Sequence, residues 1–210
     1  MLFDLGPYTL AALGFALLGA AFVRGYSGFG FSAIFIAFAS LVTNPVPLIP
    51  VVFSCEILMT ALQARGIRRH IDWPRVMSLI LLSGWTLQRR IGTGGHLGVG
   101  FISGLCNGAG IGGLPVAAFM SAQPMAAPIF RATMIVYLTG LDLITMPLMW
   151  AGGLVTLDTA IGAALAFPIL ALGVWLGGRQ FLSATPVTFR KFAVMLLLTL
   201  SSLGLIRAFI

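Results

Sequence analysis

Four charged residues lie inside long apolar segments of this chain, where a charge is costly and is usually either paired or functional. They are Arg24, Glu56, Arg131 and Asp142. An arginine in such a segment could hold an anion, and Glu56 and Asp142 are the candidates for proton coupling. Arg24 could equally extend to the membrane interface, and Asp142 could hydrogen-bond the end of a broken helix instead of relaying protons.

The positions of Glu56 and Arg131 suggest a relationship between them. Aligning their two segments through Phe53 and Phe130 places Glu56 within two positions of Ser54, the equivalent of Arg131. We therefore predict one of two arrangements. Either Glu56 and Arg131 form an ion pair, or Arg131 faces a substrate while Glu56 accepts a proton.

Two glycine-rich runs interrupt the apolar segments, at Gly25–Gly30 and at Gly104–Gly113. Glycine inside a helix costs roughly 1 kcal/mol relative to alanine, so each run predicts a break between two half-helices. The backbone N–H groups that open the next half-helix can bind anions, and glycine lets a ligand approach without a Cβ in the way. The alternative is that these glycines only let helices pack closely. The candidate substrate-binding residues are Arg24, Ser27, Gly28, Gly30, Asn107, Gly108, Gly110, Gly112 and Arg131.

The composition defines the class of protein to which these residues belong. The chain has 210 residues, of which 59% are hydrophobic and 8% are charged, and its mean hydropathy is +1.06. A soluble domain carries about 25% charged residues, and disordered chains are poor in apolar ones, so both classes are excluded. The sequence therefore predicts an all-α, polytopic helical membrane protein surrounded by the lipid bilayer.

The charge pattern also limits the partners and the chemistry. The net charge is +7, but the basic residues gather between apolar runs, where they orient a chain in the membrane. We therefore expect no nucleic acid as a partner. The two cysteines and two histidines form no metal-binding motif, so we expect no cofactor, no metal and no enzymatic activity.

The two glycine runs have related surroundings, which predicts an internal repeat with halves 1–95 and 96–210. Each half opens with a glycine-broken helical hairpin and continues with a pair of prolines and a helix. If the basic clusters at 65–69, 89–90 and 179–191 all face the cytoplasm, the two halves are inverted relative to each other. Chance similarity among glycine-rich apolar segments is the alternative.

The two halves differ in length. From Asp72 to Arg89 the first half has 18 residues, whereas from Asp158 to Arg207 the second half has 50. The first half therefore lacks most of a helical hairpin. A second copy of the chain could complete it, which would favour a homodimer.

Two longer runs resemble a known family. GVGFISGLCNGAGIGGLPVAAF (Gly98–Phe119) and PIFRATMIVYLTGLDL (Pro128–Leu143) are similar to segments of the sulfite exporter TauE/SafE family. The resemblance implies an all-helical permease of the bacterial inner membrane for small anions such as sulfite, sulfonates or related organic anions. Between Arg75 and Arg89 the family has two full helices, and this chain is shorter there. The alternative is a non-transporting or truncated membrane protein with an assembly role or no activity.

Overall fold

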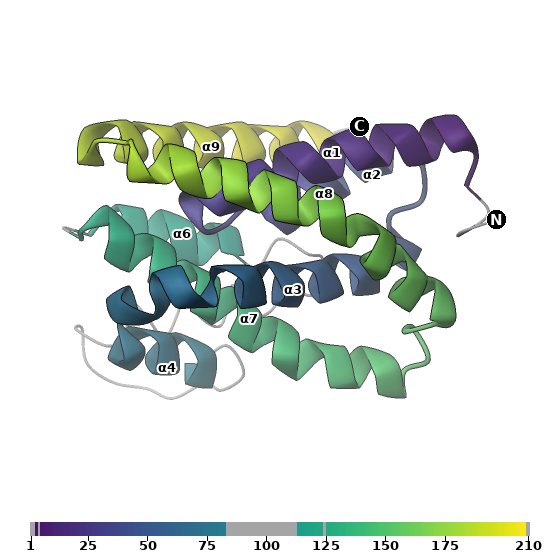
Figure 1. Ribbon diagram of the computed structural model, residues 1–210, viewed down its shortest axis with the longest axis horizontal. Coiled ribbons are helices and arrows are strands. Elements are labelled where there is room, and N and C mark those ends of the chain that lie inside the picture. Colours follow the sequence, from purple (N-terminus) through teal and green to yellow (C-terminus); the bar gives the residue numbers. More distant parts are fainter. Residues whose placement is uncertain (1–2, 4, 83–112, 124, 209–210) are drawn as a thin grey trace.

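The computed structural model of the chain describes Phe3 and residues 5–82, 113–123 and 125–208. This part contains eight α-helices and no β-strand (Figure 1). The helices are α1 (Pro7–Ser27), α2 (Phe31–Val42), α3 (Ile49–Ile67), α4 (Trp73–Leu82), α6 (Gly113–Ser121), α7 (Ala127–Ala151), α8 (Leu157–Leu182) and α9 (Pro186–Ala208). Short 3-10 helices at Val46–Leu48 and Arg68–His70 adjoin α3.

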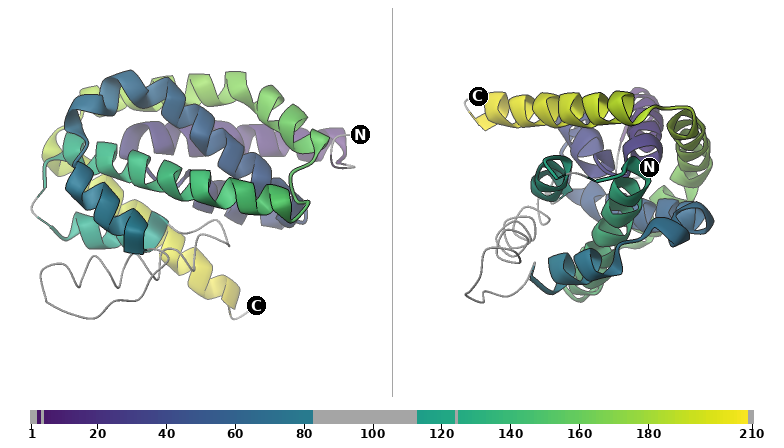
Figure 2. Two further views of the ribbon diagram at one scale, coloured as in Figure 1. Left: turned by 90° about the horizontal axis from the view of Figure 1, so that it is seen from below. Right: turned by 90° about the vertical axis from the view of Figure 1, so that its left-hand side faces the viewer.

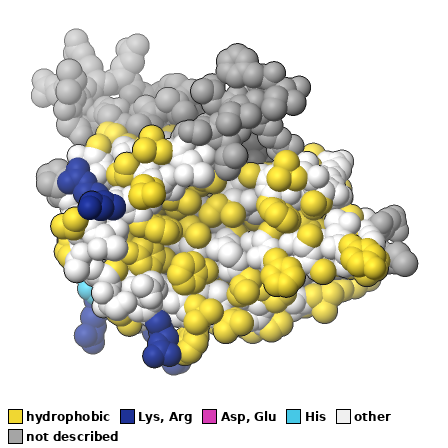
Figure 3. Space-filling model, turned by 90° about the horizontal axis from the view of Figure 1, so that it is seen from above, with side chains coloured by type: hydrophobic (Ala, Val, Ile, Leu, Met, Phe, Trp, Pro, Cys, Tyr) yellow, Lys and Arg dark blue, Asp and Glu magenta, His cyan; other side chains and the backbone are white. Residues whose placement is uncertain are grey.

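Four segments of the described chain are long and apolar enough to cross a membrane. They are Pro7–Ser27, Val46–His70, Ala127–Ala151 and Leu157–Leu182. Large apolar side chains also lie on the outside of the bundle, as at Phe15, Leu41 and Trp150, and hydrophobic side chains extend across the face shown in Figure 3. A water-facing surface rarely exposes so many apolar groups together. The described part of the chain is therefore all-helical, as predicted, and its long apolar helices are those of a membrane protein; the inverted repeat stays a prediction.

Most of the helices lie roughly along one axis, which α9 crosses obliquely (Figure 2), and the basic residues gather at one end of it. In Figure 1, α1, α3, α6 and α8 run from right to left, and α2, α7 and α9 run from left to right. The end of α3, the end of α8 and the start of α9 therefore meet at the left, where Lys and Arg side chains appear in Figure 3. We call this the basic end; its residues are Arg65, Arg68, Arg69, His70, Arg179, Arg190 and Lys191. The positive-inside rule predicts that the basic end faces the cytoplasm.

Local sequence signals explain where several helices begin. Proline lies in the first turn of α1, α3 and α7, where its missing N–H has no partner to lose. Helix α8 begins after Thr156, whose side chain forms a reciprocal capping box with Thr159, and Asp158 adds a negative charge to the first turn.

Helices α1 and α8 pack backbone to backbone because small residues line both of them. A Cβ atom placed on Gly25 would lie 2.6 Å from the carbonyl oxygen of Val174, and one on Gly173 would lie 2.7 Å from the Cβ of Ala21. A Cβ on Gly177 would collide with the carbonyl oxygen of Phe22. Close approach of this kind is a common way for membrane helices to associate. It fixes the position of α1 up to its last turn.

Two apolar clusters meet where α1 gives way to α2. One cluster joins α1, α2, α3 and α8 and contains Phe31. The other joins α6, α7 and α9 and contains Tyr26 and Phe29. Phe29 and Phe31 are both fully buried and lie on either side of Gly30, so the chain between α1 and α2 is held by both clusters.

Candidate functional site

The first glycine run breaks the helix, as the sequence predicts. Helix α1 ends at Ser27, Gly28 and Gly30 have φ angles of 86° and 89°, and α2 begins at Phe31. These left-handed angles are costly for residues with a Cβ. The Ser27 hydroxyl lies 2.8 Å from the carbonyl oxygen of Val23 and 2.9 Å from that of Phe29, so it can donate to either. The chain then reverses, and α2 runs back along α1 as a hairpin (Figure 1).

The glycine at the break also packs against another helix. A Cβ on Gly28 would lie 2.7 Å from the carbonyl oxygen of Arg131 in α7. This is the close packing that one interpretation of the glycine run expects. Anion binding by the N–H groups of α2 stays a prediction, as does the role of Ser27, Gly28 and Gly30 in substrate binding.

Two arginines donate hydrogen bonds to backbone carbonyl groups at the break between α1 and α2. Arg24 donates from Nη1 to the carbonyl oxygen of Gly28 at 3.0 Å. Arg131 donates from Nε and Nη2 to the carbonyl oxygen of Gly25 at 3.0 and 2.7 Å. The guanidinium carbon of Arg131 also lies 4.6 Å from the centroid of the Phe181 ring. Both cations therefore stabilise the negative end of the α1 dipole.

Glu56 forms its ion pair with Arg24, so the predicted ion pair between Glu56 and Arg131 is wrong. The Glu56 Oε2 atom lies 3.6 Å from Arg24 Nη1, and the two side chains are 2% and 0% exposed. The reason is the register of α3 against α7, which run side by side in opposite directions (Figures 1 and 2). Thr60 of α3 meets Thr139 of α7. Arg131 is eight residues before Thr139, about 12 Å along the helix, and lies beside α1 and α8 instead.

The other predicted arrangement, with Arg131 facing a substrate and Glu56 accepting a proton, stays a prediction. In the described part of the chain Arg131 has no carboxylate partner within ion-pair distance.

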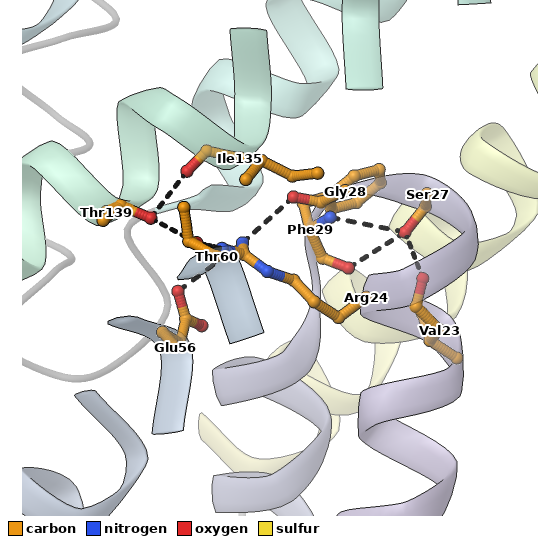
Figure 4. A network of polar contacts seen from close by, with 9 residues as sticks. All are labelled: Val23, Arg24, Ser27, Gly28, Phe29, Glu56, Thr60, Ile135 and Thr139. Atoms are coloured by element: carbon orange, nitrogen blue, oxygen red, sulfur yellow. Dashed lines mark hydrogen bonds and ion pairs between the residues drawn. The ribbon is translucent and has the colours of Figure 1, made fainter. Parts of the chain in front are cut away.

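A chain of hydrogen bonds extends from Arg24 into α7 (Figure 4). Arg24 Nη2 donates to Thr60 Oγ1 at 3.2 Å, and the hydroxyl oxygens of Thr60 and Thr139 are 2.6 Å apart. Thr139 donates to the carbonyl oxygen of Ile135 at 2.9 Å, so the Thr60 hydroxyl must be the donor between the two threonines. The sequence analysis missed both threonines. Their signal is spacing: Thr60 is four residues after Glu56, and Thr139 is three residues before Asp142.

Asp142 completes the cluster. Its side chain is 2% exposed and lies three residues after Thr139 on α7, on the same side of the contact between Thr60 and Thr139 as Glu56 on α3. We call Arg24, Glu56, Thr60, Thr139 and Asp142 the central cluster. Thr139 is the middle residue of α7, which is one of the segments able to cross a membrane, so the cluster lies near the middle of the bundle.

Several polar atoms in and beside the cluster are buried without a hydrogen-bond partner among the described residues. They are Arg24 Nε, Glu56 Oε1, Asp142 Oδ2 and both side-chain polar atoms of Gln63. Buried polar groups are almost always hydrogen-bonded in proteins, so unmatched ones that lie together indicate a role beyond packing.

Four candidate residues lie outside the described residues: Asn107, Gly108, Gly110 and Gly112. The second helix break therefore stays a prediction, as does the boundary between the proposed halves at 95–96. The described chain resumes at Gly113, where a Cβ would lie 2.9 Å from Leu138 Cδ2.

Comparisons of the chain with protein-family models, with curated proteins and with solved structures give no match. The resemblance to the sulfite exporter family stays a prediction. The fold and the site define an all-helical membrane protein with a charged cluster buried beside a broken helix.

Proposed function

We propose that this chain is a membrane transporter for small anions such as sulfite, sulfonates or related organic anions. The observation that carries the proposal is the central cluster at the middle of a membrane-spanning helix, beside the break between α1 and α2. Intramembrane charges and interrupted helices at mid-depth are features of secondary transporters.

A pocket at the basic end supports an entry route. It has a volume of about 270 Å³ and is lined by residues of α6, α7 and α9, including Phe130 and Arg190, and by Gln123 and Met125 between α6 and α7. The Phe130 ring packs against the Phe29 ring at the break, with 5.9 Å between their centroids. Arg131, which has no carboxylate partner in the described part, is the next residue along α7. Arg190 is the cation among the residues that line the pocket, and a cation there suits an anionic substrate.

The directions of the helices support the proposed inverted repeat. After the first glycine run, α2 runs toward the right of Figure 1 and α3 runs back toward the left. After the second glycine run the order is reversed, because α6 runs toward the left and α7 runs toward the right. We further propose that the chain lies in a bacterial inner membrane with the basic end in the cytoplasm, and that a second copy completes the first half as a homodimer.

The test of transport is the flux of radiolabelled sulfite into proteoliposomes that contain the purified chain. We expect uptake above that of empty liposomes, and we expect Arg131→Glu to abolish it. The matched control is Arg68→Glu, an arginine in the short helix that follows α3 at the basic end, which should retain flux. Uptake no faster than in empty liposomes would reject transport of sulfite, and wild-type flux in Arg131→Glu would reject the substrate role of Arg131.

A second candidate is a non-transporting membrane protein, and one observation favours it. Both arginines already bind carbonyl groups of α1, and Gly25 and Gly28 are closely packed, as a purely structural break requires. The same flux experiment separates the two candidates if sulfonates are tested beside sulfite.

A further inference from the structure

Glu56 and Asp142 form a buried pair of carboxyl groups contributed by two different helices. Each side chain is 2% exposed, and the two groups lie on the antiparallel helices α3 and α7, each about one turn from the 2.6 Å contact between Thr60 and Thr139 and on the same side of it. Each has one buried oxygen, Glu56 Oε1 and Asp142 Oδ2, that receives no hydrogen bond from the described residues. Two carboxylates have no hydrogen to place between them, so both groups cannot be satisfied while both are ionised.

The charges around the pair do not balance two carboxylates. Arg24 of α1 is the cation in ion-pair contact with Glu56. The other charged or titratable groups on the helices packed around the pair are Tyr8 and Tyr26 of α1, Cys55 and Arg65 of α3, Arg131 and Tyr137 of α7, and Asp158 and Arg179 of α8; α2 carries none. Of these, Arg131 is bound to the carbonyl group of Gly25, and Asp158 and Arg179 lie in the first and last turns of α8.

We propose that Glu56 and Asp142 share a single proton, which forms an O–H···O bond between the two carboxyl groups. One proton leaves one negative charge on the pair, and Arg24 balances that charge. Two negative charges in contact inside a protein repel each other strongly. One of two adjacent buried carboxyl groups therefore stays protonated.

The surroundings of the pair differ on its two sides. Toward the basic end, the same faces of α3 and α7 carry Thr60, Thr139 and then Gln63, which is 7% exposed and has an unpartnered amide. In the other direction Val52 on α3 and Met146 on α7 are apolar, and the hydroxyl group of Thr145, three residues after Asp142, donates to the carbonyl oxygen of Leu141. Hydroxyl groups can accept a proton on one side and release their own on the other, whereas apolar side chains cannot. Polar side chains of both helices continue toward the basic end, so we expect the shared proton to exchange with that end.

If the shared proton drives transport, that role rests on the proposed transport function. The presence of a shared proton between the two carboxyl groups does not depend on that function. The experiment below measures the proton by spectroscopy, so its failure and the failure of transport are distinguishable.

The first experiment is infrared spectroscopy of the purified wild-type chain in lipid at neutral pH. The chain has five Asp and Glu residues in total, which keeps the spectrum simple. We expect a carboxylic acid C=O band that shifts in D2O and is absent in both Asp142→Asn and Glu56→Gln, because the remaining carboxylate is balanced by Arg24. Asp158→Asn is the matched control and should keep the band. Absence of the band from the wild-type chain, or its survival in either single variant, would overturn the shared proton.

The second experiment measures how fast the band shifts after transfer into D2O. We expect Gln63→Leu to slow the exchange by at least about tenfold, because it removes the polar group nearest the basic end. Ser54→Ala, on α3 but toward its other end, should exchange at the wild-type rate. Equal rates in the wild-type chain and Gln63→Leu would overturn the route, as would slowing by Ser54→Ala.

Discussion

Arg24 and Arg131 bind the same broken end of α1, yet their surroundings differ. Arg24 is fully buried, lies 3.6 Å from a carboxylate and hydrogen-bonds a threonine of α3. Arg131 is partly exposed, lies over an aromatic ring and has no carboxylate partner in the described part. A charge within a bundle must be neutralised or reach a polar phase. Arg24 is therefore suited to hold the central cluster together, and Arg131 to meet an anion.

Removing Arg24 is the change with the largest expected effect. Arg24→Gln leaves Glu56 and Asp142 without their cation, and breaking a buried ion pair from one side costs about 3–5 kcal/mol. The free energy of unfolding in mixed detergent and SDS micelles measures this loss. The double variant Arg24→Gln, Glu56→Gln should recover part of it, because the unbalanced carboxylate is then gone. Wild-type stability in the single variant would show that Arg24 is not part of a buried ion pair.

Replacing Gly28, which lies between the two arginines, should have the next largest effect. Gly28→Ala combines a left-handed φ with a Cβ that would lie 2.7 Å from the Arg131 carbonyl oxygen, so we expect a loss of about 2–4 kcal/mol. In Gly30→Ala the Cβ would meet side-chain ends alone, of which Leu196 Cδ2 is the nearest at 3.3 Å, so we expect a cost of about 1–2 kcal/mol.

Gly19→Ala is the matched control for both glycine variants. Gly19 lies inside α1, and a Cβ there would meet nothing within 4 Å, so alanine should stabilise the helix by up to about 1 kcal/mol. Chemical unfolding of the three variants gives their order. Equal losses in Gly28→Ala and Gly30→Ala would contradict the contact between Gly28 and α7.

The variant Arg131→Gln sharpens the comparison between the two arginines, because its effect on stability should differ in size from its effect on anion flux. We expect a modest loss of stability, about 1–2 kcal/mol, from the hydrogen bonds to Gly25, and a loss of anion flux of at least about tenfold. Unfolding and proteoliposome uptake are measured on the same preparation, with Arg179→Gln as the control at the basic end. If flux falls only in proportion to the folded fraction, Arg131 has the same structural role as Arg24.

The smallest effect is expected for the threonine pair. Thr139→Val removes the acceptor of the Thr60 hydroxyl and should cost about 1 kcal/mol. A double-mutant cycle with Thr60→Val measures the coupling between the two hydroxyls. A coupling energy near zero would show that their 2.6 Å contact contributes nothing to stability.

The helix break and the placement of charge could be predicted from particular residues, because their causes are local. A run of glycines weakens a helix and allows left-handed angles such as those at Gly28 and Gly30, and basic residues between apolar runs collect at helix ends. The partner of Glu56 could not be predicted in the same way. Alignment of the two halves placed Glu56 near Arg131, but α3 and α7 pack at Thr60 and Thr139 instead.

The amino-acid sequence by itself determined that this is an all-helical membrane protein whose first long apolar segment breaks within the run Gly25–Gly30. Composition and backbone preference act without reference to distant residues. The tertiary structure alone decided that Arg24 meets Glu56, that Asp142 lies beside Glu56, and that Arg131 turns to the carbonyl of Gly25. These contacts depend on how far each helix is rotated and shifted along its neighbours. Close packing of α1 on α8 at Gly25 and Gly173 sets the rotation and the shift of these two helices. The two glycines are about 150 residues apart in the chain, so local sequence signals cannot predict their contact.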